Sequence, residues 1–504
     1  MYAAFTGPTR GWLIARYFLT LSLSLRAHDR ARPSFRRFGA AAATLAASVV
    51  LVAAPAAAAG TSPATAPAAA LTDSPAATLR TNLNLLAQEH VYLAGAAIDA
   101  ALGGRTDEFT IAAAATDRNS QDLAAAVGSV YGPEAQQTFL NLWRAHIGFF
   151  VDYTQATAAK DKGKQAKARA DLDGYRQDID AFFTGANPNL PKGAVAQLFV
   201  AHVQHLTGAI DMLAAGDLSG GYAMLRMAAQ QTPELMDPLS AAIVKQFPDR
   251  FPGSVDSPAT GLRVALNNLA QEHVYLAGFA FNAALAGRTD EFNVAAAATD
   301  QNTQDLAAAV GSVYGADAQQ TFLRLWRAHI GFFVDYAQGA ATNDSAKMAK
   351  ARADLDGYRA DIDAFFSGAN PNLPRGAVAE LFVAHVQHLT GTIDMLAAGN
   401  VSGAYAMLRM AAQQTPELAN ALAEGIVAQF PDKFTATAGN ATMPAAITPD
   451  NVAPNLDLGM TARDGKSLSL ESTATRTMFV TVWGSTAPAE WVTEHNLELT
   501  QLGR

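Results

Sequence analysis

The sequence has no cysteine among its 504 residues. Disulfides, thiolate nucleophiles and cysteine metal ligands are therefore excluded, and the chain must be held by apolar cores or by a bound ligand. Charged residues are also scarce, at 16% of the chain, and they leave a net charge of −9. A negative field does not attract nucleic acid or anionic lipid, so neither is expected as a partner.

Common catalytic signatures are missing as well. The sequence contains no phosphate-binding glycine loop, no HExxH and no GxSxG. The usual motifs of nucleotide-binding proteins and hydrolases are therefore absent. We favour a non-catalytic protein over an enzyme on this ground.

The amino terminus has the pattern of a targeting segment. Arginines that end with Arg36 and Arg37 precede an apolar run over 38–54, and small residues follow at 57–59. This pattern predicts a signal or leader segment over 1–59, and therefore export to the extracellular space or the cell envelope. The arginine pair also fits a twin-arginine signal. Later apolar runs are shorter than the ~20 residues that span a bilayer, so we expect no stable membrane insertion once the leader is removed.

The rest of the chain is dominated by an internal repeat. An offset of 183 residues aligns 79–250 with 262–433 without a gap and with about three-quarters identity. The predicted segments are a leader, a disordered linker, repeat 1, a linker, repeat 2, a second linker and a tail, over residues 1–59, 60–77, 78–250, 251–261, 262–433, 434–450 and 451–504.

Each repeat is expected to be a helical bundle. Apolar residues recur every three or four positions, and glycine and proline separate the periodic segments. In repeat 1 the predicted helices cover 78–102, 107–130, 134–158, 166–184, 192–215 and 218–246. The predicted fold class is therefore all-α, with two tandem bundles of about six helices each and a short α/β-like tail.

Histidines lie on the apolar faces of these helices. In the first predicted helix Leu83, Leu86, His90 and Leu93 step by three or four residues, which places the imidazole on the face that a bundle turns inward. The third and fifth helices repeat the pattern. The repeats together hold eight of the ten histidines, namely His90, His146, His202, His205, His273, His329, His385 and His388.

Imidazoles that converge from facing helices are a common way to build a metal site inside a bundle. Neutral histidine binds copper, zinc, nickel or iron, so one transition-metal site is predicted in each repeat. Further side chains nearby are candidates for an additional ligand or for holding the ligands in place, namely Glu89, Asp152 and Met212 with their counterparts Glu272, Asp335 and Met395. The residue types do not select one metal.

Three alternatives remain at this stage. The inward histidines could instead hydrogen-bond to Tyr92, Tyr153 or Tyr175 in a polar core, which would suit a structural or interaction module of the cell envelope without metal. They could act as a pH sensor, because imidazoles become charged between about pH 5 and 7, and a charged ring would strain the core. A metal-dependent redox enzyme would further require an open coordination position and an accessible pocket.

Several segments resemble a known family. EHVYLAG, LWRAHIGFFVDY, AHVQHLTG and VKQFPDRF are similar to segments of exported bacterial helical-repeat proteins that are often labelled copper amine oxidase. The resemblance covers both repeats and implies copper binding. The chain lacks the Asn-Tyr-Asp/Glu sequence and the His-x-His pair that a copper amine oxidase needs, so the resemblance does not extend to oxidase chemistry.

The tail from residue 451 onward resembles the opening of a thioredoxin-like domain. In that fold a tryptophan leads into a Cys-x-x-Cys pair, whereas here Trp483 is followed by Ala487 and Pro488 without any cysteine. The resemblance therefore implies a partial thioredoxin-like segment that is inactive in redox chemistry.

Overall fold

The computed structural model describes residues 71–434 together with 468–470 and 499–501. The predicted leader and the predicted linkers over 60–70 and 435–450 lie outside these residues. Most of the predicted thioredoxin-like segment does so too. Among the described helices, none combines the length and the apolar character that a membrane span requires.

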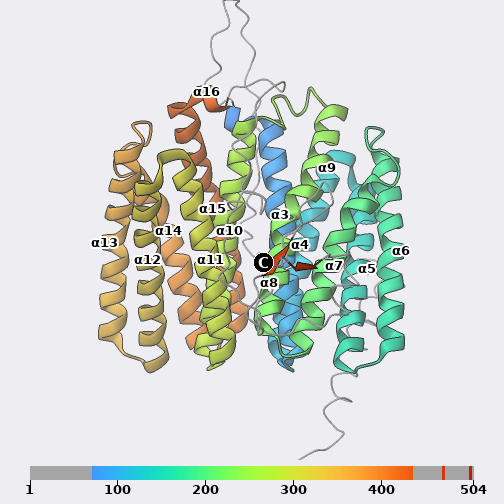
Figure 1. Cartoon of the computed structure of the whole chain (residues 1–504), viewed down its shortest axis with the longest axis horizontal. Helices are drawn as coiled ribbons and strands as arrows, with labels where there is room; N and C mark the ends of the chain where they lie inside the picture. The colour runs from blue at the N-terminus through green and yellow to red at the C-terminus, as the bar shows by residue number, and fades with distance from the viewer. Residues whose placement is uncertain (1–70, 435–467, 471–498, 502–504) are drawn as a thin grey trace, which may run out of the picture. The chain divides into compact units, whose positions relative to one another are not determined.

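Both repeats are helical, as predicted (Figure 1). The helices of repeat 1 are α3 (Pro75–Leu102), α4 (Thr106–Tyr131), α5 (Pro133–Ala158), α6 (Lys162–Ala186), α7 (Ala194–Ala214), α8 (Leu218–Gln230) and α9 (Thr232–Gln246). The helices of repeat 2 are α10 (Pro258–Leu285), α11 (Thr289–Tyr314), α12 (Ala316–Thr342), α13 (Ser345–Ala369), α14 (Ala377–Ala397), α15 (Val401–Gln429) and the short α16 (Pro431–Phe434). The all-α fold class is therefore confirmed for the two repeats.

Local sequence explains where the helices begin. Ser74 caps α3 by accepting a hydrogen bond from the backbone N–H of Ala77, and Pro75 occupies the first turn, where its missing N–H costs nothing. Asp180 on α6 caps the start of α7, because its carboxylate accepts the backbone N–H groups of Gly193, Val195 and Ala196. These three hydrogen bonds connect α6 to α7.

One predicted helix is divided in repeat 1. The prediction over 218–246 corresponds to α8 and α9, which are separated at Gln231, whereas the equivalent stretch of repeat 2 is the continuous helix α15. Repeat 1 has Pro233 and Pro238 in this region, whereas repeat 2 has only Pro416 because Ala421 stands at the second position. A second proline removes a second helical N–H donor, which weakens a continuous helix here.

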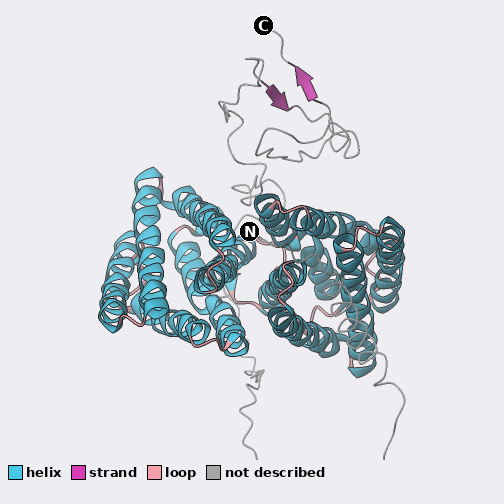
Figure 2. Cartoon of the chain, turned by 90° about the horizontal axis from the view of Figure 1, so that it is seen from below, coloured by secondary structure: helices cyan, strands magenta, loops and turns pink. Residues whose placement is uncertain are grey.

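The apolar faces of the helices form a separate core in each repeat. In repeat 1 the core joins Leu123, Phe139, Ile179, Phe199 and Leu239, which come from five different helices. The equivalent core of repeat 2 contains Leu306, Phe322, Ile362 and Phe382. Figure 2 shows the two bundles of helices from below. Core residues lie against the inward histidines, as Trp143 does against His146 and Trp326 against His329.

The two repeats pack against each other through their first helices, α3 and α10, which lie side by side in Figure 1. Residues 71–77 also belong to the packed structure, although the sequence pattern assigns them to a linker, because Leu71 packs in a small core of repeat 2 with Ala259 and Val427.

Further along the chain, β1 (Leu468–Leu470) and β2 (Leu499–Gln501) form an antiparallel pair in which Leu468 lies opposite Gln501.

Candidate metal centre

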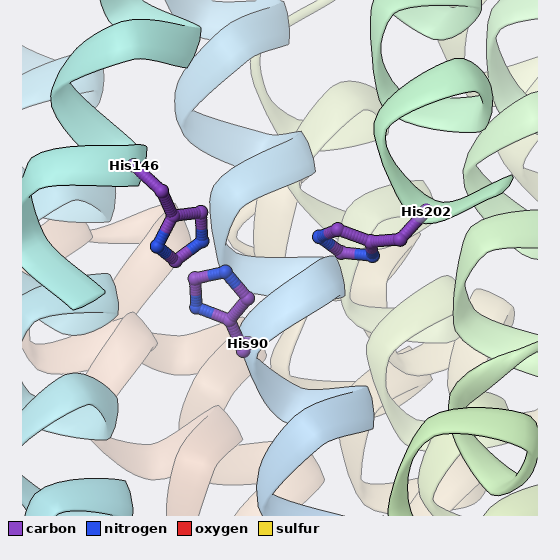
Figure 3. A group of neighbouring side chains, drawn as sticks. All are labelled: His90, His146 and His202. Carbon is purple, nitrogen blue, oxygen red and sulfur yellow. The ribbon is translucent and has the colours of Figure 1, made fainter. Parts of the chain in front are cut away.

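Three helices of repeat 1 each direct one histidine to the same interior point. His90 comes from α3, His146 from α5 and His202 from α7, and Figure 3 shows the three rings facing one another. Their exposed fractions are 2%, 1% and 3%. The helical phase predicted this inward orientation, because each histidine continues an apolar stripe.

The ring nitrogens are close enough to hold one ion. In each repeat, one ligand nitrogen from every histidine lies within 4.8 Å of the other two. Nitrogens bound to a common ion at ~2.0–2.1 Å lie about 3.4 Å apart, so small side-chain rotations would complete the coordination. The structure therefore brings together two triads, His90–His146–His202 and His273–His329–His385.

The first two histidines of each triad are placed alike. The ring centroids of His90 and His146 are 5.4 Å apart, and those of His273 and His329 are 5.3 Å apart. In repeat 2 the ring of His385 completes the group, at 6.2 Å from His273 and 6.4 Å from His329. We refer to these groups below as the repeat 1 triad and the repeat 2 triad.

Aromatic side chains enclose the repeat 1 triad. The ring of Trp143 lies 4.5 Å from His146, and Tyr175 stacks on the same imidazole at 4.9 Å. Phe150 and Phe199 contact the ring of His202 edge-on. Such an enclosure fixes the imidazole positions and excludes competing polar groups, as a metal site needs. The spacing of Trp143 and His146, one turn apart on α5, is the sequence signal that links them.

The triad nitrogens lack the hydrogen bonds that buried polar atoms usually make. Both ring nitrogens of His146 and both of His202 are buried without a hydrogen-bond partner among the described residues, and so is Nδ1 of His90. The tyrosines that could have satisfied them do not do so. Tyr92 donates to Glu272, Tyr153 to Asp211, and the Tyr175 hydroxyl has no partner within residues 71–434. This arrangement favours a bound ligand over a polar core in which the histidines hydrogen-bond to other side chains.

Burial also keeps the imidazoles in the form that binds metal. Desolvation, with a smaller contribution from His202, lowers the pKa of His90 to about 3, and desolvation lowers the pKa of His202 to about 4. The pKa of His146 falls well below its usual range for the same reason. The rings are therefore neutral at physiological pH, so no proton has to be displaced when a metal binds.

The other two predicted histidines do not join the triads. His205 and His388 lie one turn further along α7 and α14, and neither contributes to the ligand groups found within 71–434. Nδ1 of His388 lies 3.1 Å from Oε1 of Gln414 instead.

The predicted carboxylate ligands are also placed elsewhere. Glu89 accepts hydrogen bonds from Tyr275 and Arg409, and Glu272 accepts them from Tyr92 and Arg226, so both carboxylates face the opposite repeat. The prediction that Glu89 and Glu272 add a metal ligand is corrected by this geometry. A helix turns about 100° per residue, so neighbours of an inward histidine point to a different side.

Each triad therefore offers three neutral nitrogen donors and no carboxylate. Three histidines are a known ligand set for a four-coordinate ion, whose fourth position is filled by a small molecule. Nitrogen donors suit copper, zinc, nickel and iron, whereas magnesium and calcium require oxygen. Comparison of the chain with family models, with curated proteins and with solved structures finds no match.

Proposed function

We propose that this chain is an exported metal-binding protein that holds one transition-metal ion at each histidine triad. The observation that carries the proposal is the convergence of three imidazoles from three helices, twice in one chain, with their nitrogens within 4.8 Å of one another. Five of the six histidines are buried, and His385 is partly buried. Export is supported by the arginine-led apolar segment within residues 1–59.

We assign the sites to metal storage or sequestration, not to catalysis. A catalytic metal needs a position that substrate can reach, and the repeat 1 histidines are at most 3% exposed. Enclosure by aromatic rings suits retention of an ion, because it keeps water and competing ligands away from the metal. Copper, zinc, nickel and iron all fit the donor set, and the experiment below separates them.

The test is metal loading of the purified protein that has been stripped of metal. We expect two equivalents per chain of at least one of copper, zinc, nickel and iron, measured by elemental analysis after removal of excess ion. Binding at a free concentration of 100 times Kd should stabilise the fold by about 2.7 kcal/mol for each occupied site, which is seen as a rise in melting temperature.

Histidine variants provide the matched control. His146→Gln combined with His329→Gln removes one ligand from each triad and should abolish tight binding. His205→Gln combined with His388→Gln removes the same number of imidazoles outside the triads and should leave two equivalents bound. No retained ion and no thermal shift with any of the four metals would defeat the proposal and leave a structural module of the cell envelope.

A further inference from the structure

The ion pairs between the two repeats are reciprocal. The guanidinium of Arg409 on α15 donates to Glu89 on α3 at 3.0 and 2.9 Å, and the guanidinium of Arg226 on α8 donates to Glu272 on α10 at 2.9 and 3.2 Å. The two pairs are equivalent, because Arg226 and Arg409 are separated by 183 residues, and so are Glu89 and Glu272. Glu89 is 2% exposed and Glu272 is 1% exposed, so both carboxylates depend on an arginine of the opposite repeat.

Tyrosines extend the same symmetry. Tyr92 of repeat 1 donates its hydroxyl to Glu272 at 2.7 Å, and its equivalent Tyr275 donates to Glu89 at 2.8 Å. The two tyrosine rings stack on each other, with centroids 5.5 Å apart. A residue that meets its own equivalent lies on a two-fold axis, which is the mark of an isologous interface.

The segments that precede the first helices are exchanged between the repeats. Arg80 on α3 donates to the backbone carbonyl of Val255, which leads into repeat 2, at 2.8 Å. Arg263 on α10 donates to the carbonyl of Thr72, which leads into repeat 1, at 2.5 Å. Thr72 and Val255 are again separated by 183 residues. We call the segments before α3 and α10, residues 71–74 and 254–257, the leading arms. The leading arm of each repeat therefore contacts the first helix of the other repeat.

Ion pairs further from the stacked tyrosines are also made twice, once from each repeat. Arg105 of repeat 1 lies 3.8 Å from Glu291, and its equivalent Arg288 lies 3.6 Å from Glu108. Four kinds of contact are thus made twice with the roles of the repeats interchanged. They are the buried arginine–glutamate pairs, the tyrosine contacts, the contacts of the leading arms and the outer ion pairs. A pair of domains joined end to end by chance would make each contact once.

A buried carboxylate whose guanidinium partner is lost is strongly unfavourable. The face formed by α3 and α8, together with the leading arm, therefore requires an arginine from another repeat. We propose that this face is a self-association surface whose partner is a second copy of the same repeat, and that the covalent link between the two copies is not needed to hold them together. The interface is that of a homodimer whose subunits are joined in one chain.

The full chain can test this proposal after the link is cut. A specific protease site is inserted between Gly253 and Ser254, both exposed, so that each product keeps its own leading arm. After complete cleavage we expect the two halves to elute together at the volume of the uncut chain, and native mass spectrometry to give the summed mass. Separation of the halves on cleavage would overturn the proposal.

Variants of the cleavable chain identify the contacts responsible. Arg226→Gln with Arg409→Gln should raise the concentration at which the cut halves separate by roughly a thousandfold, because a hydrogen-bonded charge pair that contributes about thirtyfold is broken twice. Arg144→Gln with Arg327→Gln changes two ion pairs inside the repeats whose side chains are 33–48% exposed, and it should have no such effect. Equal association of the two double variants would contradict the proposal.

A milder pair of variants covers the case in which the arginine variant does not fold before cleavage. Tyr92→Phe with Tyr275→Phe removes only the two hydroxyl donors to Glu272 and Glu89. It should fold and should still weaken association of the cut halves relative to the Arg144 and Arg327 control. An unchanged association would overturn the proposal.

Discussion

In repeat 1 the residue His202 is 3% exposed, whereas its equivalent His385 in repeat 2 is only partly buried. The tryptophan contacts of the two triads differ little. Trp143 lies 4.5 Å from His146, and Trp326 lies 4.6 Å from His329. The third histidine is therefore enclosed to different degrees in the two repeats, so the two sites should exchange metal at different rates.

The last helices of the repeats differ more. Repeat 1 divides this stretch into α8 and α9, and Asp237 on α9 forms a bidentate ion pair with Arg80 at 2.7 and 2.5 Å. In repeat 2 the equivalent residue on α15 is Asn420, which makes a single hydrogen bond with Arg263 at 2.8 Å. These changes leave the triads in place, because the triad histidines come from the first, third and fifth helices of each repeat.

The largest effect is expected when one triad is broken and the other is left intact. His146→Gln should reduce bound metal from two equivalents per chain to one, and His329→Gln should do the same, because each triad is complete within its own repeat. Elemental analysis of the two single variants gives the stoichiometry. Loss of both ions from either single variant would show that the repeats do not bind independently.

Acid should destabilise the metal-free protein through the same histidines. The pKa of His90 and of His273 is about 3 in the folded chain, because burial disfavours the charged ring, whereas an unfolded chain protonates near 6.5. The unfolded state therefore binds more protons below about pH 6.5, and the free energy of unfolding falls as the pH decreases toward about 3.

Urea denaturation between about pH 7 and about pH 4.5 measures this slope. The variant with His146→Gln and His329→Gln should have a shallower slope, because it lacks two buried imidazoles whose pKa values are lowered by burial. An identical pH dependence in both proteins would contradict the assignment of the acid sensitivity to the triads.

A smaller effect is expected in the rate of metal release. The His146→Gln variant retains only the repeat 2 triad, and the His329→Gln variant retains only the repeat 1 triad. Because His385 is partly exposed, a chelator should remove the ion from the His146→Gln variant faster. Equal rates, followed by absorbance of the chelator complex, would mean that the difference in burial does not control access.

The smallest effect concerns the last helices. Asp237→Asn should destabilise the protein by about 1 kcal/mol, since it replaces a partly buried bidentate ion pair with the neutral contact found in repeat 2. Asn420→Asp should have the opposite sign, because it supplies the carboxylate that Arg263 lacks on α15. Denaturant unfolding of both variants measures the difference, and the same sign in both would refute this explanation.

Much of the site could be predicted from helical periodicity. His90 and His146 continue apolar stripes with steps of three or four residues, and a bundle turns such stripes inward. The same rule overextended the site to His205, which shares a helix face with His202 but lies one turn away. The rule also did not predict the direction in which Glu89 points. This residue adjoins an inward histidine, yet its carboxylate faces the other repeat.

The contacts between the repeats could not be predicted in this way. Arg226 and Arg409 each stand in an apolar run, which signals a buried charge with a partner. The partner of Arg409 is Glu89, 320 residues away, and no local pattern connects them. The division of α8 from α9 was missed for a related reason, because proline within a periodic segment either bends or interrupts a helix depending on its packing.

X-ray absorption spectroscopy of the metal-loaded protein tests the central claim most directly. We predict a first shell with three imidazole nitrogens at ~2.0–2.1 Å, together with the outer-shell scattering that imidazole rings produce, and loss of this signal in the variant with His146→Gln and His329→Gln. A first shell made of oxygen alone, or a shell unchanged by those substitutions, would contradict the account.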